Sequence, residues 1–135
     1  VVDLIADAMK SVAARCPGDD TIQTLYAEAI MDTQPWDYWE AGGIRPKGRA
    51  AEMLAALERV YARNPDHPGA LHLYIHAVEA SARPERALPH ARRLAALMPG
   101  AGHIVHMPAH IYYRVGLYRE SLDANKRAVA VDEQY

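Results

Sequence analysis

The stretch GHIVHMPAH holds three of the seven histidines of the chain within nine residues. His103, His106 and His110 are spaced so that an α-helix would bring all three to one face. A second pair, His72 and His76, has the i and i+4 spacing that presents two imidazole nitrogens to one metal ion. Imidazole nitrogens are ligands of zinc, copper, iron and nickel. The first chemistry that these residues suggest is therefore binding of a divalent transition metal.

The composition narrows the class of protein. The chain has 135 residues, of which 50% are hydrophobic, and a formal net charge of −2, so it has enough apolar side chains for one domain with a real core. A basic stripe interleaved with aromatic residues is absent, which argues against a nucleic-acid partner. The single cysteine, Cys16, excludes an intrachain disulfide and a cysteine-rich zinc module. No apolar run approaches the roughly 20 residues that span a bilayer, which argues against a membrane partner.

The pattern of apolar residues favours helices throughout. Leu, Ile, Val, Met and Ala recur at helical spacing, and Pro- and Gly-containing stretches separate the periodic segments. Nothing in the pattern indicates strands. The sequence therefore predicts about seven helices, near residues 1–15, 20–33, 48–63, 68–81, 84–97, 103–115 and 118–133.

The prolines that follow these helices reveal an internal repeat. Pro99 follows Pro65 at a spacing of i, i+34. Pro65 follows Pro17 at a longer spacing, i, i+48. The difference between the two spacings equals the length of one inserted loop, QPWDYWEAGGIRPK, at residues 34–47. A helix–turn–helix unit with a period of about 34 residues is typical of the tetratricopeptide repeat.

The chain resembles the tetratricopeptide family in further detail. Gly116 falls at the usual turn between paired helices, and GLYRESLDANKRAV is similar to the second half of a repeat. The strings PWDYW, HPGALHLYIHAVE and GHIVHMPAHIY are similar to those of one bacterial tetratricopeptide subgroup, whose members are longer and mostly have no assigned biochemical role. The resemblance implies an all-α solenoid of half a repeat followed by three repeats, and a fragment of a longer chain.

The repeat divides one domain, residues 1–135, into four parts. We expect the second helix of an upstream repeat at 1–17, a first repeat at 20–65 that includes the inserted loop, a second repeat at 68–101 and a third repeat at 102–135. The first helix begins with an apolar end, which we expect to pack on an upstream repeat or on a second copy of the chain.

The sequence gives no address signal, so we expect the protein in the cytoplasm by default. A targeting segment upstream of residue 1 would change this expectation.

The repeat also brings the histidines into register. The i, i+34 spacing of the prolines also relates His72 to His106, and His76 to His110. In the tetratricopeptide family these slots line the concave groove where ligands bind, and the resemblance extends that role to neighbouring slots. We predict that the four histidines His72, His76, His106 and His110 are metal ligands. The resemblance adds Glu28, Glu79, His103, Tyr113 and Arg114 to the groove.

Two features of this groove have two interpretations each. Pro108 lies inside the helix predicted for 103–115. Either it kinks this helix and turns His106 relative to His110, or the helix simply starts late, after PGAG. The inserted loop carries Trp36 and Trp39. These side chains either wall a ligand as part of a lid over the groove, or plug a gap between helices.

Three functions remain open at this stage. The first is a binding module whose His- and Glu-lined groove holds a zinc, copper, iron or nickel ion, or a small polar ligand. The second is a plain scaffold for a protein or peptide, although the slots of the chaperone-type carboxylate clamp, which uses Lys, Asn and Arg, hold Thr, Glu and His here. The third is a metal-dependent enzyme, or part of one, with water activated at an open coordination position.

Overall fold

The computed structural model describes residues 1–134 and is helical throughout that range, apart from the connections. Within this range the only β-type pairing is an isolated bridge between Trp39 and Pro46 in the inserted loop. The elements in chain order are α1 (Val2–Arg15), α2 (Asp20–Met31), α3 (Ala50–Arg63), α4 (Pro68–Glu79), the 3-10 helix η1 (Pro84–Ala87), α5 (Leu88–Leu97), α6 (Gly102–His106), α7 (Pro108–Arg114) and α8 (Tyr118–Asp132).

The all-α prediction is confirmed, and its seven helices correspond to these elements. The segment predicted at 84–97 begins as η1 and continues as α5, with Pro89 in the first turn of α5. The segment predicted at 103–115 is divided into α6 and α7 at Met107. Each difference coincides with a proline near a helix start, where the missing backbone N–H and the fixed φ angle are tolerated.

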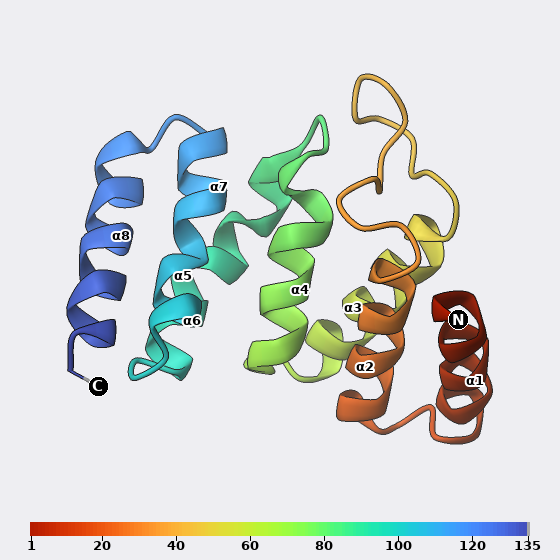
Figure 1. Ribbon diagram of the computed structural model, residues 1–135. Coiled ribbons are helices and arrows are strands. Elements are labelled where there is room, and N and C mark those ends of the chain that lie inside the picture. The colour runs from red at the N-terminus through yellow and green to blue at the C-terminus, as the bar shows by residue number, and fades with distance from the viewer. Residues whose placement is uncertain (135) are drawn as a thin grey trace.

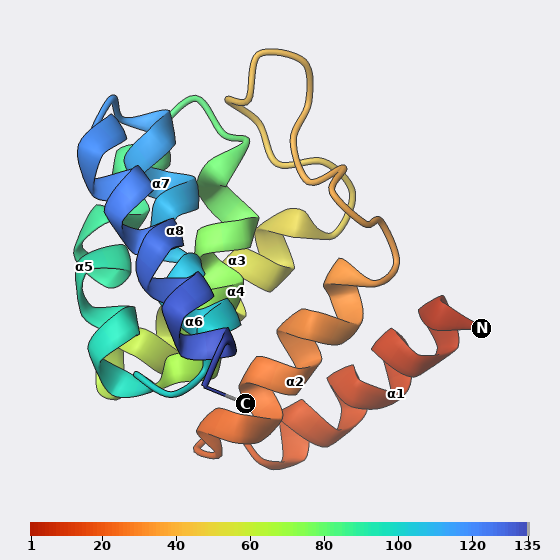
Figure 2. The ribbon, with the colours of Figure 1, turned by 60° about the vertical axis from the view of Figure 1, so that its left-hand side comes forward.

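The helices lie side by side in chain order, from α1 at one end to α8 at the other (Figure 1). Helix α4 lies in the middle and contacts α2 on one side and α7 on the other. Helices α3 and α5 form a second row that packs against α2 and α4, and α8 covers α6 and α7 at the C-terminal end (Figures 1 and 2). This is the arrangement of a helix–turn–helix solenoid.

Local signals fix where the helices begin. The Asp19 carboxylate accepts a hydrogen bond of 2.9 Å from the backbone N–H of Ile22 and so caps α2. The His67 Nδ1 atom plays the same part for α4 by accepting from the N–H of Ala70 at 3.1 Å. Gly116 has a φ of 81° between α7 and α8, a conformation that glycine adopts without strain.

Helix α4 has one side in the core and another side that carries two histidines. Leu71, Ile75 and Val78 are fully buried against the neighbouring helices, and each buried aliphatic side chain contributes about 1.5–3 kcal/mol to folding. His72 and His76 lie on the other side of the helix and are half-buried. The packing that holds α4 in place therefore also fixes the direction of its histidines.

The N-terminal helix exposes apolar side chains. Val1, Leu4 and Ile5 are 92%, 73% and 52% exposed, which agrees with the apolar end recognised in the sequence, and its packing on an upstream repeat or a second copy stays a prediction. Among residues 1–134 no helix combines the length and the apolar character needed to cross a membrane.

Candidate metal centre

Helices α4, α6 and α7 bring five histidines together. Helix α4 carries His72 and His76, and α6 and α7 face it with His103, His106 and His110. Neighbouring imidazole rings of this cluster lie close together. Their centroids are 5.0 Å apart for His72 and His76, and 5.3 Å apart for His76 and His110. The cluster is thus built across the joint between two repeats and not within one helix.

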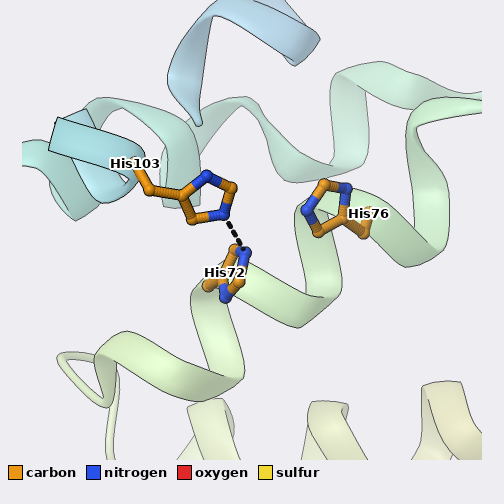
Figure 3. Close-up of side chains that lie close together, drawn as sticks. All are labelled: His72, His76 and His103. Carbon is orange, nitrogen blue, oxygen red and sulfur yellow. Dashed lines mark hydrogen bonds between the residues drawn. The ribbon is translucent and has the colours of Figure 1, made fainter. Parts of the chain in front are cut away.

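Three of these side chains form a first possible metal site. His72, His76 and His103 offer nitrogen atoms that all lie within 4.8 Å of one another (Figure 3). The Nε2 atoms of His72 and His103 are 3.0 Å apart. Two nitrogens bound to one tetrahedral zinc ion at about 2.1 Å lie about 3.4 Å apart, so small rotations of the side chains suffice to hold an ion.

A second possible site shares His76 with the first. His76, Glu79 and His110 also offer three ligand atoms within 4.8 Å of one another. The two Glu79 oxygens face different histidines, with Oε1 at 3.0 Å from His76 Nδ1 and Oε2 at 2.6 Å from His110 Nδ1. This carboxylate therefore connects the second repeat to the third.

His106 lies beside this group but outside both sets of three. Its Nε2 atom is 2.9 Å from Nε2 of His110, and its Nδ1 atom is 2.7 Å from Oδ1 of Asn125. The structure thus groups the four histidines of the sequence-based ligand set differently. It places His72 and His76 with His103, and it places His110 with His76 and Glu79, whereas His106 lies outside both sets.

The surroundings favour a neutral imidazole at His72 and at His103, and an ionised carboxylate at Glu79. Burial, followed by the charges of three nearby histidines, lowers the pKa of His72 to about 4. Burial also lowers the pKa of His103. Burial raises the pKa of the Glu79 carboxyl group, but hydrogen bonds from His110 and His76 outweigh it and bring that pKa to about 2. Neutral imidazole and carboxylate are the forms that bind a metal ion.

Pro108 interrupts the helix that carries the last three histidines. Helix α6 starts at Gly102, the last residue of PGAG, and the helix is then interrupted at Met107. Pro108 begins α7, and His110 N–H bonds the carbonyl of Met107 at 3.2 Å, one residue closer than in a regular α-helix. Such a break changes the direction of the His110 side chain relative to His106.

The two tryptophans of the inserted loop have different roles. Trp39 packs against the core and donates an Nε1–H hydrogen bond of 2.7 Å to the carbonyl of Ala77, near the end of α4. Trp36 is 66% exposed, and its ring meets the His76 ring edge-on with centroids 5.0 Å apart. Trp36 also has a φ of 63°, a strained value for a bulky residue. One tryptophan therefore anchors the loop, and the other stands beside the histidines.

The remaining groove residues lie around the cluster. Tyr113 and Arg114 line a pocket of about 310 Å³ together with Glu79, His106 and His110. Arg114 also donates to the carbonyl of Ser81 at 3.2 Å and lines a second pocket, of about 350 Å³, under the inserted loop. Glu28 is exposed on α2 and belongs to neither set of three.

Two contacts were outside the sequence-based prediction. At the site, Asn125 comes from α8, and no spacing signal connects it to His106. Away from the site, His90 on α5 packs against the rings of Tyr61 and Tyr74, with centroids 4.4 and 5.2 Å apart. Burial lowers the pKa of His90 as a consequence.

Comparison with known proteins supports the fold. The paired helices form an all-α fold of the tetratricopeptide-like solenoid type. The solved structure MamA MSR-1 C2, of a tetratricopeptide-repeat protein, matches 98% of this chain with a TM-score of 0.69. The sequence identity is 20%, and 68% of that chain is covered, so the likeness concerns the fold. No protein-family model and no curated protein sequence matches the chain.

Proposed function

We propose that this domain is a binding module whose groove holds a divalent transition-metal ion through His72, His76 and His103. The observation that carries the proposal is the convergence of three imidazoles from two successive repeats, with their ligand atoms within 4.8 Å. A half-buried histidine that serves only in packing needs a single hydrogen-bond partner. Three histidines that turn their nitrogens toward a common point are instead typical of a ligand set.

The neighbouring carboxylate supports this assignment. Glu79 accepts a hydrogen bond from His76 Nδ1, which leaves Nε2 of that ring as the free ligand atom. Figure 3 shows this other nitrogen of His76 facing His72 and His103. Carboxylates that hold the second nitrogen of a ligating histidine fix its tautomer and orientation, and raise its basicity.

The proposed site has room for a further ligand. Three protein ligands leave one position of a tetrahedral ion open for water or a small polar molecule. Trp36 stands next to His76 and would border that position. This is the point at which a metal-dependent enzyme would bind its substrate, and binding is the minimum function that the geometry supports.

A second candidate is the binding of a peptide or a small polar ligand without metal. It is favoured by the pocket of about 350 Å³ between the inserted loop and the end of α4. This pocket is lined by Trp36, whose ring is largely exposed, and by the positively charged Arg114. A large exposed aromatic beside a cation is a common feature of protein-binding surfaces.

The first test is metal analysis of protein purified without a nickel column, followed by thermal melts with chelator and with added Zn²⁺, Cu²⁺ or Fe²⁺. A free ion concentration of 100 Kd should stabilise the domain by about 2.7 kcal/mol. His103→Ala should abolish the effect of the ion at the three-histidine site. His67→Asn, which changes a histidine outside the groove and keeps a side chain able to cap α4, should leave it unchanged.

Absence of bound metal together with unchanged melts for all three ions would refute the proposal. Titration with a peptide library would then test the second candidate. The diagnostic variant is Arg114→Gln, which should weaken peptide binding if the pocket under the loop is used.

A further inference from the structure

A row of hydrogen bonds beside the three-histidine site has one proton too few. The row runs from Asn125 through His106 and His110 to Glu79, with contacts of 2.7, 2.9 and 2.6 Å. Asn125 Nδ2 donates to the carbonyl of Ser121 at 2.9 Å, so its Oδ1 atom faces His106 as an acceptor. The Glu79 carboxylate at the other end is also an acceptor.

The three contacts of this row share only two N–H protons. Each of the three contacts needs one proton between its two atoms. Two neutral imidazoles supply one N–H each, and both ends of the row supply none. One contact therefore faces lone pair to lone pair unless an extra positive charge is present.

The contact at which a missing proton causes the strongest repulsion is that between His110 Nδ1 and Glu79 Oε2, next to His76. If His106 donates to Asn125, its Nε2 accepts from His110, and the Nδ1 atom of His110 is then bare opposite the Glu79 carboxylate. A cation between His110 and Glu79 would remove the repulsion, and His76 supplies a third ligand atom within 4.8 Å.

We propose that a second divalent transition-metal ion binds between His76 Nδ1, Glu79 and His110 Nδ1, so that the ring of His76 bridges two ions. The inference rests on the proposed function, because the first ion lies on the Nε2 side of the same ring. When the second ion binds, the Nδ1 proton of His76 leaves to solvent and a nitrogen–metal bond takes its place. The ring then carries one negative charge that both ions share.

The ligand atoms have to move apart by less than about 1 Å to take up the ion. His76 Nδ1 lies 3.0 Å from Glu79 Oε1, and His110 Nδ1 lies 2.6 Å from Glu79 Oε2. Two atoms bound to one tetrahedral ion lie roughly 3.4 Å apart, so both contacts lengthen when the ion binds. His110 keeps its Nε2–H bond to His106, and His106 keeps its bond to Asn125, so the row has all its protons once the ion is in place. Asn125 and His106 act as positioning residues for His110.

A third proton on the row is the competing explanation. It would make one imidazole an imidazolium ion paired with Glu79, and the groove would then hold a single metal ion. The two explanations differ in stoichiometry, which a titration measures directly.

The experiment is calorimetric titration of the metal-free chain with Zn²⁺, checked by metal analysis after dialysis. We expect two ions per chain for the wild type and one for Glu79→Gln. The matched control Glu120→Gln, an identical change at an exposed position on α8, should keep two ions. His103→Ala should also bind one ion, at the second site, and circular dichroism verifies that each variant is folded. His110→Asn serves as a second variant if Glu79→Gln does not fold.

Copper adds a spectroscopic readout. Two Cu²⁺ ions joined by one imidazole ring couple magnetically, so the paramagnetic signal of the fully loaded wild type should fall well below that of two separate ions. The singly loaded Glu79→Gln variant should show the full signal of one ion. One Zn²⁺ per wild-type chain, unchanged in Glu79→Gln, would overturn the inference and leave the proposed function intact. No ion in any variant would instead refute the proposed function.

Discussion

Glu52 connects the first three helices and offers a quantitative test of how the solenoid is held together. Its carboxylate on α3 accepts a hydrogen bond from Tyr26 on α2, forms an ion pair of 2.7 Å with Lys10 on α1, and pairs with Arg49 at 3.2 Å. Burial alone would raise the pKa of Glu52, but these three partners outweigh it and bring the pKa to about 2. Replacement by glutamine keeps the size of the side chain and removes its charge.

The magnitude follows from the displacement of the pKa. A fall from 4.5 to about 2 corresponds to at most about 3.4 kcal/mol of stability at neutral pH. The Glu52 side chain is 31% exposed and that of Lys10 is 58% exposed, so solvent screening reduces the expected loss to about 1–2 kcal/mol. Because the pKa in the folded state is lowered, the contribution is complete above pH 4.5 and is lost as the pH falls toward 2.

The assay is urea unfolding of the wild type and of Glu52→Gln between pH 7 and pH 2. The difference in the free energy of unfolding should be about 1–2 kcal/mol at pH 7 and should vanish as the pH approaches 2. Glu28→Gln, at an exposed position, should stay within about 0.5 kcal/mol of the wild type. A difference for Glu52→Gln that is the same at every pH would refute the reasoning, because it would not arise from the charge.

Two further predictions concern the inserted loop. Binding of Cu²⁺ at the three-histidine site should quench the fluorescence of Trp36, whose ring lies 5.0 Å from that of His76, so Trp36→Phe should lose most of the quenching; equal quenching in this variant would argue against an ion there. Gly43→Ala should destabilise the domain by about 1–3 kcal/mol in urea unfolding, because Gly43 has a φ of 69° and its added Cβ would lie 2.6 Å from the backbone nitrogen of Ala82. Gly42→Ala, with a φ of 87° and open space around it, isolates the backbone strain and should cost less.

The helices and the groove face could be predicted because both depend on periodicity. Apolar spacing and the prolines after each helix indicated the segments, and the internal repeat placed His72 and His76 in register with the later histidines. Register assigns a side chain to a face of its helix. It does not say which turns of two neighbouring helices meet.

The pairing within the cluster therefore needed the structure. His72 meets His103 rather than His106, which lies one turn further along. The interruption at Met107, one residue before Pro108, also gives His110 a separate helix from His106. The different roles of the two tryptophans depend on the path of the loop, which sequence periodicity does not describe.

The central claim is that three imidazoles from two repeats hold a transition-metal ion. Anomalous diffraction at the zinc absorption edge, from crystals of the chain grown with Zn²⁺ after removal of other metals, tests it most directly. We predict a peak at bonding distance, about 2.1 Å, from Nε2 of His72, His76 and His103. A map with zinc only on surface side chains, and with His72 and His103 still hydrogen-bonded to each other, would contradict it.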